Sequence, residues 1–164
     1  MKTDLTRIRG WMEIGQRLVE AIPSGRWTTC SLVHAVALDG TRAAMVLDGP
    51  LNGVSFGGFC EWLLAPSLHP GDFVVMDNLN THKSSLAVQA IQSVGAHVVY
   101  LPPYSPDLNP IENIFSKIKQ LIRADKPRTL SQIVHAVAKS LKLLTLDDLE
   151  SVFDHAGYLA HENT

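Results

Sequence analysis

Asp77 lies in a stretch of the sequence whose residue types are suited to metal binding or acid–base chemistry. It directly follows the apolar run 73–76, and Asn78 and His82 add polar side chains close behind it. An acid at the carboxyl end of a buried strand is placed where open α/β sheets bind ligands. A simple turn, in which Asp77 and Asn78 bond only to their own backbone, fits the local residues equally well.

Glu112 lies in a second such stretch, near the start of an amphipathic helix. Asn109 is a favoured helix cap and Pro110 a favoured first helical residue. Glu112 would then reach back to the Asn109 N–H and complete a capping box, which is a purely structural role. The prolines and Tyr104 ahead of it are not needed for a cap, and they favour a rigid loop that fixes one functional side chain.

The two stretches follow two successive apolar strands that are joined by one helix. A right-handed crossover would make strands 73–76 and 97–101 parallel neighbours, so that the loops after them face the same side. Asp77 and Glu112 are then expected to converge on a divalent cation. Mg²⁺ binds through a few carboxylates together with substrate phosphates, and paired ions support in-line attack on a phosphodiester.

The remaining pattern predicts a mixed α/β domain that would position these loops. Asp39-Gly40 between two apolar runs indicates a β-hairpin, and Ser55 is expected to cap the first helix. Strands 73–76 and 97–101 are expected to be buried on both faces. The predicted elements are a short strand within 17–21, strands at 27–38, 42–47, 73–76 and 97–101, and helices at 55–65, 84–94, 110–123, 130–143 and 146–155.

Composition limits the classes of function. The 164 residues carry 14 Lys and Arg against 16 Asp and Glu, so an overall basic nucleic-acid coat is excluded, although a local basic face is not. Two cysteines are too few for a disulfide framework or a four-cysteine zinc site. Neither a signal peptide nor a run of about 18 apolar residues is present. We therefore expect one cytoplasmic domain over residues 1–164, without a membrane partner.

The two acidic stretches together resemble a known family. VMDNLNTHK at 75–83 and LPPYSPDLNPIE at 101–112 are similar to the second and third acidic blocks of DDE transposases. The closest resemblance is to the mariner-related bacterial insertion-sequence branch, whose spacing matches the thirty-four residues between Asp77 and Glu112. The resemblance extends from about Lys2 to Tyr158. It implies an RNase H-like mixed sheet flanked by helices, with Asp77 and Glu112 as catalytic and metal-binding residues.

One feature of the family's pattern is not found in this sequence. The family's first acid lies on a strand ahead of the segment that begins at Lys2, and Met1 stands where that strand should connect. We therefore expect an N-terminally truncated domain without the central first strand, the first catalytic Asp or the DNA-reading helix-turn-helix region. Such a chain should bind Mg²⁺ or Mn²⁺ weakly and be inactive alone, with an upstream-frame fragment as a candidate partner.

The resemblance implies cleavage of insertion-sequence ends and transfer of the strands to target DNA. In supporting roles we expect Asn78, His82 and Asn109. A solvated helix face is the better explanation for any single basic residue, whereas phosphate contact is a reasonable interpretation of the whole basic cluster after Glu112. The DNA-binding candidates are Lys83, Lys117, Lys119 and Arg123. The alternative is a non-enzymatic remnant that binds DNA or forms oligomers, such as a homodimer. A Rossmann-like nucleotide site is excluded because no Gly-x-Gly-x-x-Gly follows a strand.

Overall fold

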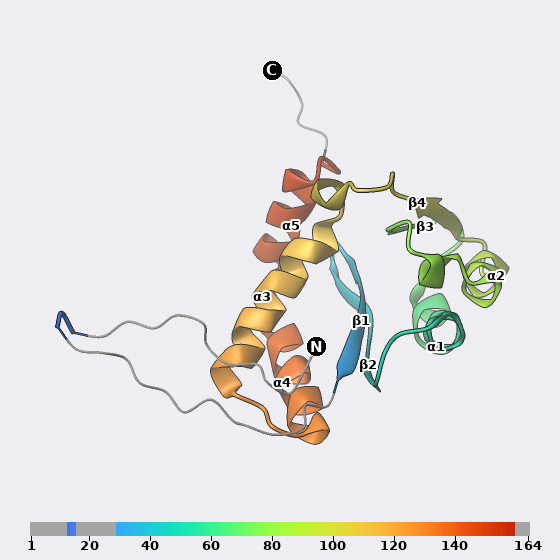
Figure 1. The fold of residues 1–164 in the computed structure, drawn as a ribbon. Coiled ribbons are helices and arrows are strands. Elements are labelled where there is room, and N and C mark those ends of the chain that lie inside the picture. The colour runs from blue at the N-terminus through green and yellow to red at the C-terminus, as the bar shows by residue number, and fades with distance from the viewer. Residues whose placement is uncertain (1–12, 16–28, 160–164) are drawn as a thin grey trace, which may run out of the picture.

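The computed structural model describes residues 13–15 and 29–159, which form a mixed α/β arrangement (Figure 1). The strand expected within 17–21 lies outside the described residues. No helix in the described part is long and apolar enough to span a membrane. The elements are β1 (Cys30–Ala37), β2 (Gly40–Asp48), α1 (Gly53–Phe59), β3 (Phe73–Met76), α2 (Ser85–Ser93), β4 (His97–Tyr100), α3 (Pro110–Asp125), α4 (Leu130–Lys142) and α5 (Leu146–His155).

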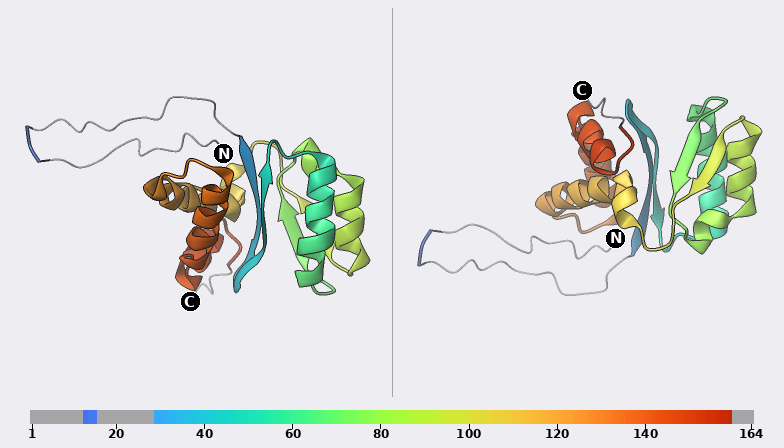
Figure 2. Two further views of the ribbon diagram at one scale, coloured as in Figure 1. Left: turned by 90° about the horizontal axis from the view of Figure 1, so that it is seen from below. Right: turned by 90° about the horizontal axis from the view of Figure 1, so that it is seen from above.

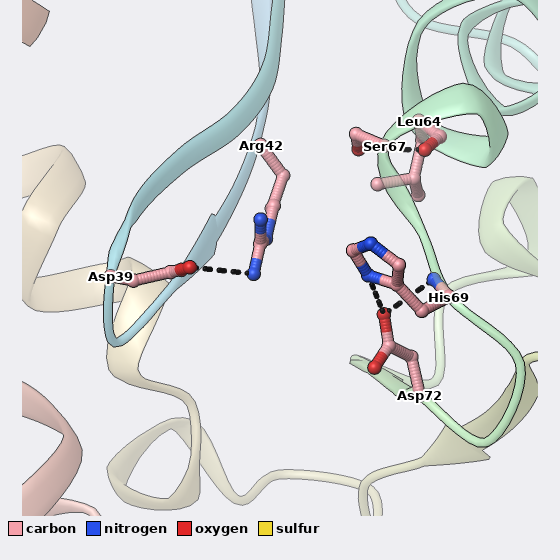
Figure 3. Close-up of polar contacts among 6 residues, drawn as sticks. All are labelled: Asp39, Arg42, Leu64, Ser67, His69 and Asp72. Atoms are coloured by element: carbon pink, nitrogen blue, oxygen red, sulfur yellow. Dashed lines mark hydrogen bonds and ion pairs between the residues drawn. The ribbon is translucent and has the colours of Figure 1, made fainter.

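The predicted hairpin is confirmed as the antiparallel pair β1–β2. Cys30 pairs with Asp48 at the open end, and Ala37 pairs with Gly40 next to the turn, with an irregularity in register after Ala35. At the turn, Asp39 accepts a hydrogen bond of 2.9 Å from Arg42 (Figure 3). Asp39 therefore has a local structural role in the hairpin.

The predicted parallel pair is also confirmed. β3 and β4 run side by side, with Phe73 opposite His97 and Met76 opposite Tyr100. The prediction that both strands are buried on both faces is wrong for the described residues. Phe73 is 69% exposed and Val99 39% exposed. Among these residues β1 pairs only with β2, and β3 only with β4, so each pair has a strand edge without a ladder partner.

Two apolar cores lie on opposite faces of the hairpin, which is sandwiched between two groups of helices (Figure 2). One face contributes Val33 and Ala43 to the first core, which it shares with α1, α2 and the β3–β4 pair. The other face contributes Cys30 to the second core, which it shares with α3, α4 and α5. Side chains alternate between the two faces of a strand, so a hairpin with apolar residues on both faces can join two cores.

The first helix begins earlier than the sequence indicated. Asn52 caps α1, and its Oδ1 accepts hydrogen bonds from the Val54 and Ser55 N–H groups. The prediction of Ser55 as the cap is wrong, because its hydroxyl instead completes the capping box from the third helical position. The helix then widens into a π-helical turn, Cys60–Leu64. The wider turn changes the helical periodicity, and Leu63, which regular helical spacing from Phe56 and Phe59 would place on the apolar face, is 41% exposed.

Gly57 marks the closest approach of α1 to α2. A Cβ built there would lie 2.7 Å from the Leu86 Cβ, whereas one at Gly58 would meet only the Trp62 ring at 3.6 Å. We expect Gly57→Ala to lower the free energy of unfolding by about 1–3 kcal/mol, because the two helices must separate. Gly58→Ala, the control, should be neutral or stabilising by up to about 1 kcal/mol through helix propensity. Urea denaturation of both variants measures the difference, and equal effects would contradict the packing argument.

His34 on β1 is buried against the second core. Its Nε2 lies 3.0 Å from the Thr41 hydroxyl, its ring packs near Phe115, and its Nδ1 has no hydrogen-bond partner among the described residues. Burial lowers the pKa of His34 to about 4. The unfolded chain therefore takes up a proton, near pH 6.5, that the folded chain takes up only near pH 4.

Stability at acidic pH should consequently depend on His34. Its contribution is fully present above about pH 6.5 and is lost as the pH falls to about 4. One pKa unit corresponds to about 1.4 kcal/mol, so the loss should be on the order of a few kcal/mol. Urea titrations at both pH values should show a smaller loss for His34→Gln than for the wild type. His135→Gln, at an exposed position on α4, is the control and should behave like the wild type.

Candidate functional site

Asp77 lies directly after the carboxyl end of β3, as expected. Its Oδ1 accepts two hydrogen bonds, one from the Leu79 backbone N–H at 3.2 Å and one from the His82 ring at 2.5 Å. Its Oδ2 has no hydrogen-bond partner among the described residues, and the side chain is 37% exposed. The carboxylate is thus oriented by one oxygen while the other remains available.

His82 is held in place from three directions. Its Nδ1 contacts Asp77, and its ring packs against the Phe56 ring of α1 with centroids 4.5 Å apart. Its carbonyl oxygen accepts a hydrogen bond of 3.2 Å from the Tyr100 hydroxyl at the end of β4. The His82 backbone N–H donates to the Leu79 carbonyl within the 3₁₀ turn Asn80–Lys83. The side chain is only 18% exposed, so its orientation is fixed by packing.

Glu112 lies in the first turn of α3, which begins at Pro110 as predicted. Asn109 is the N-cap residue, but its side chain makes no capping hydrogen bond. The alternative in which Glu112 completes a capping box is therefore not realised. Its backbone N–H bonds to the Asn109 carbonyl, while its side chain is exposed and makes no hydrogen bond or ion pair with the described residues. The carboxylate is available for an external partner.

The predicted site residues do not all gather into one ligand set. The structure brings Asp77 and His82 together, whereas within residues 13–15 and 29–159 no three His, Cys, Asp or Glu side chains form a group able to hold a metal ion. Asn78 and Asn109 are half-buried beside the two acids in sequence. Tyr104, at the tip of the proline-rich loop, is fully exposed and has a positive φ of 59°. The ring therefore packs against none of the described residues and does not stiffen the loop by side-chain contact.

The four basic candidates differ in their surroundings. Lys117 forms an ion pair with Asp148 of α5, which links the α3 and α5 helices. The hydrogen bond that Lys117 donates within this ion pair, together with one from the Thr145 N–H, lowers the pKa of Asp148 to about 2. Lys83 and Lys119 are exposed, and neither they nor Arg123 form an ion pair with the described residues. Lys83, Lys119 and Arg123 therefore have their charges available, whereas that of Lys117 is already compensated.

Phe56 and Tyr100 are the residues near Asp77 that sequence reasoning did not assign to the site. Phe56 fits the apolar face of α1 and is buried, so its pattern indicates only a core residue. Tyr100 ends a short apolar strand. Their contacts with His82 join residues 26 and 18 positions apart. Because no local pattern encodes such contacts, only the packing of α1 and β4 around the turn shows them.

Comparison with known proteins agrees with this fold. Residues 1–134 match the sequence family described as DDE superfamily endonuclease. Among solved structures, the fold is similar to a chain of the Mos1 transposase paired-end complex with left transposon end, with a TM-score of 0.72 at 12% identity. The match covers 95% of this chain and 50% of that chain, so this chain spans about half of its structural relative. No curated protein matches.

Proposed function

Because the chain belongs to the DDE superfamily endonuclease family, we propose that it forms the part of a transposase catalytic domain that carries Asp77 and Glu112. The proposed reaction is metal-dependent cleavage of DNA strands at the ends of an insertion sequence and their transfer to target DNA. The observation that carries the proposal is the oriented Asp77 carboxylate after β3, with Oδ2 unpartnered among the described residues. Glu112 is the second carboxylate available in the family's motifs.

The two acids fit a divalent cation by their chemistry. Mg²⁺ and Mn²⁺ bind carboxylate oxygens, and neither Glu112 nor Oδ2 of Asp77 is occupied by a neighbouring group in the described part. A cation bound there would supply Lewis-acid polarisation of a phosphodiester. The residues of this chain would position that cation through Asp77 and Glu112 and orient Asp77 through His82. Asn78 and Asn109 would support the two loops.

Two carboxylates alone make a weak site for such a cation. The described residues contain no cluster of three ligands, so any third protein ligand would come from residues outside 13–15 and 29–159 or from another chain, with water and DNA phosphates as the remaining ligands. A fragment from an upstream reading frame or a second copy of this chain is a candidate source. We therefore expect the isolated chain to bind Mn²⁺ weakly and to cleave no DNA.

DNA is the proposed macromolecular partner. The similar Mos1 transposase structure is a complex with a transposon end, and Lys83, Lys119 and Arg123 carry charges without ion-pair partners among the described residues. Contacts between lysine or arginine and phosphate are sequence-independent. They weaken as the salt concentration rises, because the counterions that binding displaces from the DNA then gain less entropy. Binding by this part of the chain should therefore be non-specific and steeply salt-dependent.

A labelled duplex tests the proposal. Fluorescence anisotropy at low salt should show binding that Lys119→Gln and Arg123→Gln weaken, whereas the control Lys139→Gln should not, because Lys139 is paired with Asp125 at 2.9 Å. A denaturing gel of the same samples with Mn²⁺ reports strand cleavage. Absence of binding at low salt would overturn the DNA proposal. Cleavage that Asp77→Asn abolishes would support the endonuclease and overturn the expected inactivity. DNA binding with no measurable affinity for Mn²⁺ would favour the non-enzymatic remnant.

A further inference from the structure

The contacts around Asp77 separate the roles of its two carboxylate oxygens. Oδ1 accepts from the Leu79 N–H at 3.2 Å and lies 2.5 Å from His82 Nδ1. A carboxylate can only accept, so Nδ1 carries the hydrogen of that bond. With two donors on Oδ1, the remaining Oδ2 is the oxygen that can bind an external group without breaking an existing bond.

We propose that His82 is a positioning residue which holds Asp77 for binding of a divalent cation through Oδ2 alone, and that Phe56 fixes the His82 ring for this task. This inference rests on the function proposed above. Ligand carboxylates in metal sites are commonly oriented by such hydrogen bonds from neighbouring groups, whose loss weakens metal binding by about 10–100-fold. His82 would act through Asp77 and not as a ligand itself.

The surroundings of His82 support a fixed donor. Its ring is 18% exposed and lies against Phe56, which is 5% exposed and belongs to the first core. The Tyr100 hydroxyl holds its backbone carbonyl, so the turn is tied to the end of β4 as well as to α1. A residue whose ring and backbone are both restrained by neighbours loses little further entropy when it holds a carboxylate in one orientation.

A second His–Asp pair in the chain provides a matched control. His69 Nδ1 lies 3.7 Å from Asp72 Oδ2, before β3 rather than after it (Figure 3). Both side chains are more exposed, at 76% and 40%, and no aromatic ring among the described residues packs against His69. The pair has the same residue types, three positions apart instead of five, but lacks the restraints around His82.

Titration of the full chain with Mn²⁺, followed by electron paramagnetic resonance of the free ion, tests the inference. His82→Ala should weaken Mn²⁺ binding by about tenfold or more. His82→Asn should restore most of the affinity, because its amide can donate from near the Nδ1 position. Phe56→Leu should give an intermediate loss, whereas Phe59→Leu in the same core and His69→Ala should leave the affinity unchanged.

The possible results distinguish this inference from the function on which it rests. If the wild type binds no Mn²⁺, or if Asp77→Asn binds it normally, the proposed metal site is contradicted. If Asp77→Asn loses Mn²⁺ binding and His82→Ala does not, only the positioning role of His82 is contradicted. Equal losses in His82→Ala and His82→Asn would make the imidazole a direct ligand and overturn the role as a donor. In ¹⁵N-histidine spectra without metal, a protonated Nδ1 of His82 that depends on Asp77 supports the hydrogen bond, and an unprotonated Nδ1 overturns it.

Discussion

Replacing Ile118 with alanine is expected to lower the free energy of unfolding by about 2–5 kcal/mol. Ile118 is fully buried at 0% exposure and lies midway along α3 in the core that this helix shares with β1, α4 and α5. Removal of its side chain leaves a cavity among rigid helices that can close only in part, so the loss of burial is joined by a cavity cost. Urea denaturation monitored by circular dichroism measures the change.

Ile111 provides the matched control on the same helix. It is half-buried in the first turn of α3, so Ile111→Ala should cost clearly less than Ile118→Ala. Similar losses for the two variants would show that the second core does not centre on Ile118. The comparison bears on the site because α3 carries Glu112, and a loosened α3 would move that carboxylate without any change in its chemistry.

The strongly periodic elements were predictable from the sequence. Helix α3 was predicted as an amphipathic helix, and the spacing of Ile114, Ile118 and Ile122 shows its apolar face, since all three are buried. The hairpin followed from Asp39-Gly40, and the parallel pair β3–β4 followed from the handedness of the crossover between the two strands. In each case the information is local or follows from a general rule of chain topology.

Details that depend on neighbouring elements were not predictable. The cap of α1 is Asn52 instead of Ser55, and the sequence offers both of these favoured cap residues three positions apart. The exposure of Phe73 and Val99 depends on which chain segments cover β3 and β4, which an apolar run does not encode. The sequence also left two roles open for Glu112, and the missing cap bond at Asn109 excludes the purely structural one.

The candidate site likewise has features that the sequence predicts and features that only the structure shows. Asp77 could be identified from its place after an apolar strand, and its neighbour His82 from the motif. That His82 contacts Asp77 through Nδ1, and that Phe56 and Tyr100 restrain it, follows only from the three-dimensional arrangement. The sequence therefore predicts which residues belong to the site, whereas the structure indicates which oxygen of Asp77 is available.

Whether Asp77 and Glu112 bind the same ion is open to a direct test, because Asp77 follows β3 whereas Glu112 lies in the first turn of α3, and the described residues form no three-ligand cluster. Asp77→Asn and Glu112→Gln keep the shapes of the side chains but remove one negative charge each. If both bind one Mn²⁺ ion, each variant should lower its affinity by about tenfold or more, which corresponds to about 1.4 kcal/mol. The change can be measured by titration with electron paramagnetic resonance.

The double variant decides between one shared site and two separate ones. For a shared ion, the first substitution already removes most of the binding, so the double variant should lose much less than the sum of the two single losses. Losses that add in full would mean that the two carboxylates act independently. Glu150→Gln, in which the replaced acid is exposed on α5, controls for the change in net charge and should leave the affinity unchanged. A loss of equal size in that variant would show that Mn²⁺ responds only to overall charge, and the shared site would be excluded.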